Sequence, residues 1–255
     1  MVLPSQNKES DPSFVKKTFS TLASNPALSY GDYRWKRNSV VRLQYKQSRR
    51  TLLTVLATLP KKYGNVLEVG GGDGAWTRYV AGKSRAVDFL DISPEMLTAA
   101  TYNLSAYPNI TFMEGDLLTS SLEPEKYDLI MLFRCLEYMS IKANAIQKCA
   151  TALRKNGILI IVTKNPAYLE WEKYSGGKRI HSGQISADDL RALIKEAGCT
   201  VTGTYAATLG TQLESSFSRL LWNVIHAILL VTPRVVGESL SRRYAESFLV
   251  YARKD

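Results

Sequence analysis

Short apolar runs rich in valine, isoleucine and leucine recur from about residue 62 to residue 165, and segments with helical periodicity separate them. The runs are NVLEVG, AVDFLD, NITFMEGD, YDLIMLF and GILIIVT. Strands this apolar are typical of a parallel sheet that is covered by helices on each side. With two further candidates, CTVTGTYAA and ESFLVYARK, the pattern predicts a doubly wound, mostly parallel seven-stranded α/β sheet with helices on both faces.

The segments outside this alternation are expected to be mainly helical. Residues 38–59 have helical periodicity with an apolar stripe in their second half, and Pro60 marks the end of the helix. About 37 residues separate the last two strand candidates, far more than an ordinary hairpin needs. The expected units are an N-terminal extension with a cap helix (1–60), a core (61–208), a helical insertion (209–245) and the last core strand (246–255).

Charge and cysteine content narrow the expected partners and the compartment. The chain carries 33 Lys and Arg against 23 Asp and Glu, a net charge of +10, which favours an anionic partner. Cys135, Cys149 and Cys199 are widely spaced, and only His181 and His226 are available to complete a metal site. We therefore expect a reducing compartment and no bound metal. Residues 1–20 lack the apolar core of a signal peptide, so the cytosol is the expected location.

A glycine-rich turn, LEVGGGDGAW at residues 67–76, follows the first strand and is expected to enter a helix. Such a turn presents backbone N–H groups to a ligand that lies across the carboxyl edge of the sheet. A nucleoside triphosphate is excluded, because Thr77 stands where the first glycine of GxxxxGK[ST] would be. A dinucleotide fits better, since Gly70 and Gly72 match its pattern and Asp91 follows about twenty residues later.

The residue that decides between ligands is Glu68. Its carboxylate would repel a pyrophosphate but would hold a cation, and S-adenosylmethionine carries both an ammonium and a sulfonium. The stretch from Glu68 to Gly74 resembles the (D/E)xGxGxG signature of class I, Rossmann-like, S-adenosylmethionine-dependent methyltransferases. The resemblance extends over roughly residues 62–200 and includes Asp91 after the second strand and Asp116 after the third.

This resemblance implies a role for each part of the cofactor site. The loop would hold the methionine portion, Asp91 the ribose hydroxyls and Asp116 the adenine amine. Ile92 and Leu117 are placed to sandwich the adenine. The expected cofactor-binding residues are Glu68, Gly70, Gly72, Gly74, Asp91, Ile92, Asp116 and Leu117.

Two residues are candidates for the chemistry on the methyl acceptor. The segment LEYM resembles an LEH segment that is common in the superfamily, with Tyr138 in place of the histidine. His181, in KRIHSGQIS, has an imidazole that is suited to act as a base near neutral pH. We expect His181 or Tyr138 to contact the acceptor and at least one of them to assist proton removal, although a hydrogen-bonded loop histidine is an equally good interpretation of His181.

The insertion contains a nearly continuous apolar run from Leu220 to Val231, which is too short to cross a bilayer. We expect it to cover the acceptor pocket, with Trp222, Ile225 and Leu229 facing inward, or to lie at a membrane surface. Basic residues accompany the run or lie on the first long helix. They are Arg219, Arg234, Arg242 and Arg243 beside the run, and Arg42, Lys46, Arg49 and Arg50 on the helix.

The sequence therefore predicts an S-adenosylmethionine-dependent methyltransferase that acts on a small or lipid-like acceptor, with peripheral membrane contact as a further expectation. Two alternatives stay open at this point. One is a methyltransferase of RNA or another nucleic acid, which the net charge favours but no recognisable motif supports. The other is a non-catalytic regulatory or scaffold protein that binds the same cofactor. Whether the protein forms an oligomer is left open.

Overall fold

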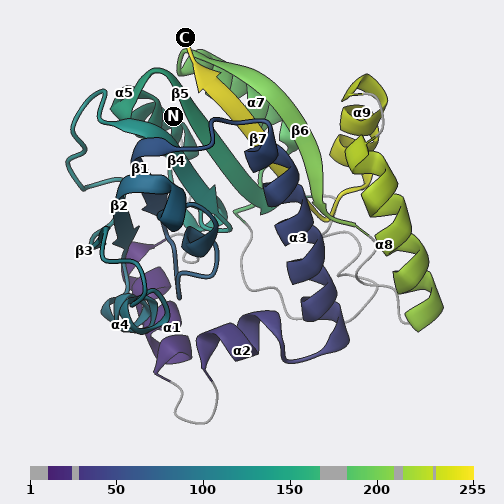
Figure 1. Cartoon of the computed structure of the whole chain (residues 1–255), viewed down its shortest axis with the longest axis horizontal. Helices are drawn as coiled ribbons and strands as arrows, with labels where there is room; N and C mark the ends of the chain where they lie inside the picture. Colours follow the sequence, from purple (N-terminus) through teal and green to yellow (C-terminus); the bar gives the residue numbers. More distant parts are fainter. Residues whose placement is uncertain (1–10, 25–28, 167–182, 210–214, 232–233) are drawn as a thin grey trace, which may run out of the picture.

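The computed structural model describes residues 11–24, 29–166, 183–209, 215–231 and 234–255. Within them, seven strands form one sheet in the order β3-β2-β1-β4-β5-β7-β6, with helices on both faces (Figure 1). The strands are β1 (Tyr63–Val69), β2 (Ser84–Asp91), β3 (Ile110–Glu114), β4 (Tyr127–Phe133), β5 (Leu153–Lys164), β6 (Cys199–Thr208) and β7 (Ser247–Lys254). The helices are α1 (Pro12–Ala23), α2 (Tyr30–Trp35), α3 (Ser39–Ala57), α4 (Pro94–Asn103), α5 (Lys142–Ala152), α7 (Ala187–Glu196), α8 (Ser216–Val231) and α9 (Arg234–Tyr244). The predicted seven-stranded α/β sheet is confirmed.

The prediction of a mostly parallel sheet needs correction, because the sheet is mixed. β1, β2, β3, β4 and β5 pair in parallel, whereas β7 is antiparallel to both of its neighbours, β5 and β6. Thr208 at the end of β6 lies opposite Ser247 at the start of β7. The chain therefore leaves and re-enters the sheet at the same edge, which forces an antiparallel strand, since a parallel one requires a crossover to the opposite edge.

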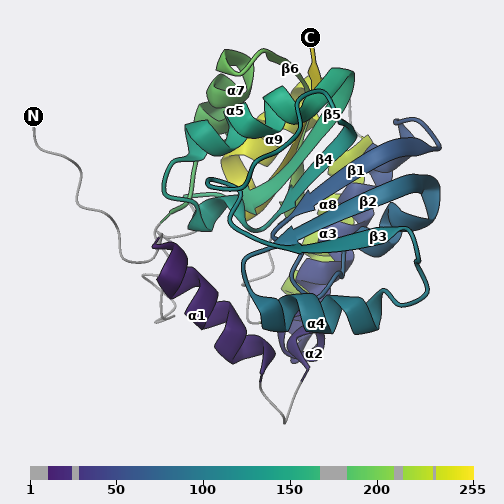
Figure 2. The ribbon, with the colours of Figure 1, turned by 90° about the vertical axis from the view of Figure 1, so that its left-hand side faces the viewer.

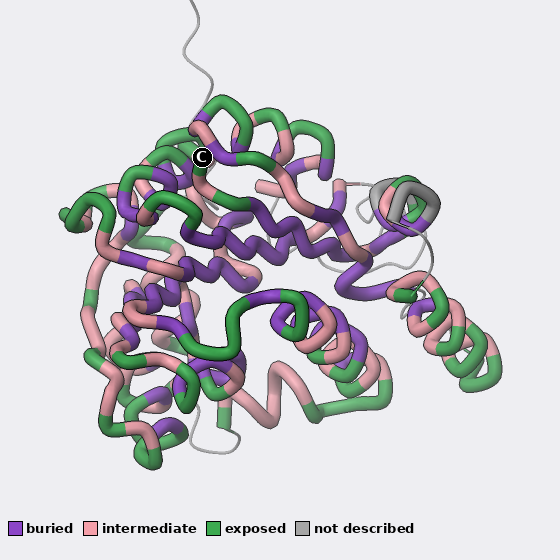
Figure 3. The backbone as a smooth tube through the Cα atoms, turned by 45° about the horizontal axis from the view of Figure 1, so that its top comes forward, coloured by how far each residue is buried: buried purple, intermediate pink, exposed green. Residues whose placement is uncertain are grey.

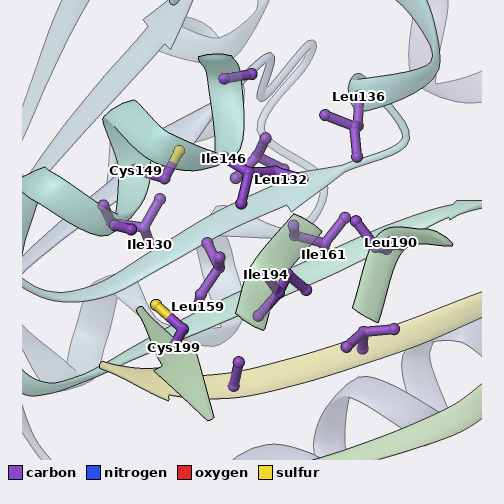
Figure 4. Packing of buried hydrophobic residues seen from close by; sticks show 14 of the residues in the cluster. Ile130, Leu132, Leu136, Ile146, Cys149, Leu159, Ile161, Leu190, Ile194 and Cys199 are labelled. Carbon is purple, nitrogen blue, oxygen red and sulfur yellow. The ribbon is translucent and has the colours of Figure 1, made fainter. Parts of the chain in front are cut away.

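The core lies on the two faces of the sheet, as the alternation of side chains along a strand requires. On β4, Ile130 packs with Ile146 of α5 and Ile194 of α7 on one face (Figure 4). Its neighbour Met131 points to the other face and packs with Leu52 of α3. All five of these side chains are fully buried, so the central strands are apolar on both faces, as their sequences predicted.

The connection from β1 to β2 contains two 3₁₀ segments, Thr77–Tyr79 and Ala81–Lys83, where the sequence predicted a helix. Trp76 covers this part of the sheet instead, and its ring stacks on Phe133 with the ring centroids 4.0 Å apart. The glycine turn therefore leads into a compact aromatic connection with two 3₁₀ segments, instead of the α-helix that the sequence predicted.

The chain between β6 and β7 is helical where it is described. In Figure 1, α8 stands beside α3 at the edge of the molecule, and both helices pack on β6. A buried hydrogen bond of 2.8 Å, from the Leu209 backbone N–H to Gln47 Oε1, joins the end of β6 to α3. The outer helix is thus attached to the core through α3 and β6.

Gly74 provides a test of the backbone geometry that the turn requires. Its φ is +78°, and an added Cβ would lie 2.5 Å from Leu104 Cδ1, which is buried. We expect Gly74→Ala to lower the free energy of unfolding by about 2–4 kcal/mol, because left-handed strain and overpacking add. In the matched control Gly82→Ala, the added Cβ would meet nothing closer than 3.6 Å. Urea denaturation compares the two variants, and equal stability would contradict this geometry.

Candidate functional site

A pocket lies at the carboxyl ends of β1, β2, β3 and β4, and α1 and α2 close over it. Figure 2 shows α1, α2 and α4 together at the bottom of the view, below the sheet. A bond of 3.1 Å between the hydroxyls of Ser20 on α1 and Ser93 at the start of α4 fastens the first helix here. Lys16 of α1 also forms an exposed ion pair of 2.6 Å with Glu114, the last residue of β3.

The glycine turn forms one wall of the pocket and is tied to the end of β2. The Gly70 N–H donates to the Leu90 carbonyl at 2.7 Å, and the Gly72 N–H donates to Asp91 Oδ2 at 2.8 Å. Gly70 has a φ of +62°, and a Cβ there would lie 2.5 Å from the Cβ of Cys135. A side chain at this position would therefore clash with the segment that follows β4.

Three carboxyl groups are buried together around this turn. Glu68 is fully buried, and its Oε2 accepts a hydrogen bond from the Thr77 hydroxyl at 2.5 Å. Its other oxygen, Oε1, has no hydrogen-bond partner among the described residues. Burial, together with the charges of Asp73 and Asp91, raises the pKa of Glu68 to about 8. Burial also raises the pKa of Asp73 and of Asp91.

The cluster lacks a cation of its own within the part of the chain that the structure describes. Arg78 acts on the pKa of Asp73, but no ion pair there involves Glu68, Asp73 or Asp91. The same residues contain no group of three or more His, Cys, Asp or Glu side chains arranged to hold a metal ion. The Glu68 oxygen without a hydrogen-bond partner lies close to two other carboxyl groups. Such a site is suited to a ligand that carries an organic cation.

The residues expected for the nucleoside line the same pocket. Asp91 and Ile92 follow β2, while Asp116 and Leu117 follow β3. Asp116 Oδ1 accepts from the backbone N–H of Leu118 at 3.0 Å, which fixes the side chain. Asp91 Oδ1 likewise accepts from the Ser93 N–H at 2.9 Å, so part of its hydrogen-bonding capacity holds the local backbone.

Of the predicted cofactor residues, the structure brings most to the pocket surface. Gly70, Gly72, Asp91, Ile92, Asp116 and Leu117 line it. Glu68 belongs to the carboxyl cluster directly behind the turn, and Gly74 packs on Leu104 at the far end of the turn.

Tyr138 lines the opposite side of the pocket, in the 3₁₀ segment Leu136–Tyr138 that follows β4. Its ring meets Phe19 of α1 edge-on, with the centroids 5.1 Å apart. Burial, and then the charge of Glu137, raises the pKa of Tyr138 well above its usual range. The phenol therefore stays protonated near neutral pH and is suited to donate a hydrogen bond rather than to act as a base. His181, the other predicted catalytic residue, lies outside the described residues.

Two arginines, Arg134 and Arg34, also line this pocket, and of these the sequence reasoning missed Arg34. Arg134 donates from Nε to Glu137 Oε1 at 2.8 Å, and Glu137 is fully buried. Arg34 of α2 lies over the Trp35 ring, with its guanidinium carbon 4.2 Å from the ring centroid. Burial, and then the charge of Arg134, lowers the pKa of Arg34. No described carboxylate forms an ion pair with Arg34.

Tyr30 lines the same pocket beside the glycine turn, and a Cβ on Gly72 would lie 3.7 Å from its ring. Burial raises the pKa of the Tyr30 hydroxyl to about 12. The charges of Arg34, Asp73, Asp91 and Arg134 also act on this pKa. The pocket therefore has carboxyl groups at the glycine turn and guanidinium groups on its other side. This separation of charge fits two ligands of opposite sign that lie next to each other.

The first helix was also missed, although the sequence carried its signal. Asp11 caps α1 by accepting from the Ser13 and Phe14 N–H groups, and Pro12 is the first helical residue. Val15 and Phe19, one turn apart, line the pocket. An N-cap followed by apolar residues at a four-residue spacing predicts an amphipathic helix.

None of the described residues of the insertion, for which the sequence predicted an acceptor lid, lines this pocket. Trp222, Ile225 and Leu229 do share a face of α8, as predicted, but they line a second, small cavity. The other residues that line this cavity are Leu209, Leu240 and Tyr244. Helices α1 and α2, which precede the core, provide the cover instead.

Comparison with known proteins shows what the central part of the chain is similar to. Residues 66–157 match the family model of a methyltransferase domain. The chain is 25% identical over 166 residues to a probable S-adenosylmethionine-dependent methyltransferase of Mycobacterium tuberculosis, a match that covers 65% of this chain and 60% of the relative. It is 29% identical over 168 residues to a ubiquinone biosynthesis O-methyltransferase of Histophilus somni, covering 63% of this chain and 67% of that protein.

A solved structure agrees with the fold over almost the whole length. The N-methyltransferase NodS from Bradyrhizobium japonicum, in complex with S-adenosyl-L-homocysteine, superposes with a TM-score of 0.64 and 17% identity, covering 94% of this chain and 97% of NodS. The family match, the curated relatives and this fold agree with the glycine turn and the buried carboxyl groups. Together these findings support the class I superfamily of S-adenosylmethionine-dependent methyltransferases as the family of this chain.

Proposed function

We propose that the protein transfers a methyl group from S-adenosylmethionine to a small or lipid-like acceptor that carries an acidic group. The observation that carries this proposal is the charge separation within one pocket, with buried carboxyl groups at one end and Arg34 at the other. The curated relative from M. tuberculosis is matched over only 60% of its length, so the activity is inferred from the site together with the family.

The carboxyl end has the donor groups that the cofactor requires. Glu68 and Asp73 would face the ammonium of the methionine portion, whose charge would offset the burial that raises their pKa values. Asp91 has carboxylate lone pairs for the ribose hydroxyls, and Asp116 accepts from the adenine amine. When bound, the cofactor supplies a methyl group that is activated by its sulfonium, so catalysis depends largely on how the chain aligns the acceptor.

The other end of the pocket suits an amphiphilic acceptor. Val15, Phe19 and Leu22 of α1 provide an apolar wall, and Arg34 offers a guanidinium with no described carboxylate partner. A carboxylate, phosphate or phenolate on the acceptor would complete that charge. Similarity to an enzyme named for ubiquinone biosynthesis supports an acceptor with an apolar part.

Tyr138 would orient the acceptor by donating a hydrogen bond, because its raised pKa keeps the phenol protonated. If the acceptor must lose a proton, His181 is the candidate base, and it belongs to the segment between β5 and α7. We retain this assignment because ligands of open α/β sheets bind at the carboxyl ends of the strands, and β5 ends at Lys164 on that edge.

Untargeted metabolite and lipid profiling of cells with and without the protein is the direct test of the proposal. We expect a pair of compounds that differ by one methylene, the heavier of which disappears without the protein, and we expect the lighter one to be acidic. Methylated nucleosides in RNA as the only change would favour the nucleic-acid alternative. No mass pair, together with retained cofactor binding, would favour the non-catalytic alternative.

The raised pKa of Glu68 predicts a specific pH dependence of cofactor binding. A cationic ligand favours the ionised carboxylate, so binding below about pH 8 must release the Glu68 proton. We expect the dissociation constant of S-adenosylhomocysteine to fall as the pH rises from about 6 to 8, by up to about tenfold per pH unit. Calorimetry at several pH values measures this dependence, and Glu68→Gln should flatten it.

Stability of the ligand-free protein should respond with the opposite sign. The folded-state pKa of Glu68 is raised from 4.5 to about 8, so ionisation is disfavoured in the fold and stability falls as the pH rises between these values. Glu68→Gln should remove this loss, whereas Glu196→Gln on the exposed side of α7 should change neither quantity. Parallel pH profiles for the parent and Glu68→Gln would contradict the assignment of Glu68.

Arg34 should distinguish acceptor recognition from cofactor binding. We expect Arg34→Gln to bind S-adenosylhomocysteine within about twofold of the parent and to lose product formation by about tenfold or more, as the loss of one charged hydrogen bond predicts. The exposed Arg37, whose guanidinium lies 4.5 Å from the Tyr33 ring centroid, gives the matched control Arg37→Gln. Equal product formation by both variants, measured by profiling in complemented cells, would refute an acidic group on the acceptor.

A further inference from the structure

The inner face of α8 is fixed by buried polar contacts. His226 is fully buried, and its Nε2 lies 3.2 Å from the Thr51 hydroxyl and 3.1 Å from the Ala206 carbonyl. Burial lowers the pKa of His226 to about 4, so this anchor is neutral at physiological pH. Arg50 of α3 also donates to the Asn223 carbonyl at 3.3 Å. These contacts determine which side of α8 faces away from the protein.

The outer face of α8 carries a continuous apolar stripe. Six large apolar side chains on this helix are between 49% and 83% exposed. They are Phe217, Leu220, Leu221, Val224, Ile228 and Val231. At about 100° per residue they fall within an arc of roughly 100° centred opposite His226. In Figure 3, the outermost helix, which is α8 in Figure 1, is green and pink along most of its length.

Exposed cations lie on the neighbouring helix. Arg50 of α3 contacts α8, and Lys46 and Arg42 lie one and two turns before it on the same flank. Lys46, Arg42 and Arg49 are exposed, and none of them forms an ion pair with a described carboxylate. Arg42 donates to the Lys36 carbonyl and Arg49 to the Tyr79 hydroxyl, and neither of these acceptors carries a charge.

We propose that this face docks on an anionic lipid bilayer, with the α8 stripe in the boundary between headgroups and acyl chains and the α3 cations on lipid phosphates. Aliphatic side chains gain free energy when they leave water, and cations beside them favour anionic headgroups. A second copy of this chain would instead bring together two proteins that each carry a net charge of +10. Nucleic acid would contact the cations but would gain nothing from six aliphatic and aromatic side chains.

The helix would lie on the membrane rather than cross it. Its 16 residues extend about 24 Å, less than the roughly 30 Å of a hydrocarbon core. Across the described ranges, no helix is long and apolar enough to span a bilayer. The inference does not depend on the proposed methyl transfer, but it would place the enzyme where a lipid-like acceptor is found.

Flotation with vesicles tests the proposal directly. We expect the parent to float with vesicles of phosphatidylcholine and phosphatidylserine and to bind phosphatidylcholine alone at least about tenfold more weakly, because the cations require anionic lipid. Val224→Asp and Ile228→Asp should each lose binding to the mixed vesicles by about tenfold or more. Ile141→Asp is the matched control, since Ile141 is also an exposed apolar residue but lies away from α8.

The electrostatic part has its own pair of variants. Lys46→Glu should weaken binding to the mixed vesicles. Lys195→Glu makes the same charge change at an exposed residue of α7 and should leave binding unchanged. Circular dichroism and S-adenosylhomocysteine binding verify that each variant is folded.

The proposal is overturned if the parent does not float, or if outer-face and control variants float equally. It is also overturned if the parent is a dimer that Val224→Asp converts to a monomer, because that face would then join two copies. Vesicle binding is measured without an acceptor, so its failure leaves the proposed methyl transfer untouched.

Discussion

The burial of three carboxyl groups beside the glycine turn is the constraint on which the site depends. Burial raises the pKa values of Glu68, Asp73 and Asp91. No described cation forms an ion pair with any of the three. Such an arrangement lowers the stability of the ligand-free fold, and a bound cation would offset this loss of stability. The left-handed glycines and the bond from the Gly72 N–H to Asp91 hold these groups at the pocket, and a cationic cofactor would relieve their mutual repulsion.

In the proposed function, the same pocket presents opposite charges to two reactants. Carboxyl groups would face the cofactor, and Arg34 would face the acceptor. Because α1 and α2 provide much of the acceptor end, the segment before the core would determine which acceptor enters. On the same chain, α8 turns an apolar stripe outward beside the cations of α3, a surface that suits an anionic membrane.

The apolar pattern was sufficient to predict the strands, because a short, continuous apolar run such as YDLIMLF is typical of a strand that is buried on both faces of a sheet. It was not sufficient for the direction of β7, which depends on the edge at which α8 and α9 return the chain. The glycine turn and the aspartates were visible because their spacing is local. The place of Arg34 in the pocket was not visible in the sequence. It depends on a contact between α2 and the segment that contains Tyr138 and Arg134, about a hundred residues later. The α8 stripe was identified from its composition, but only the buried His226 shows which face points outward.

The claim that the pocket binds S-adenosylmethionine rests on the acidic glycine turn, and calorimetric titration of the ligand-free protein tests it most directly. The protein would be titrated with S-adenosylhomocysteine and, separately, with NAD, whose pyrophosphate the Glu68 cluster should repel. We expect saturable binding of S-adenosylhomocysteine and no heat of binding with NAD. Binding of NAD with no response to S-adenosylhomocysteine would contradict it.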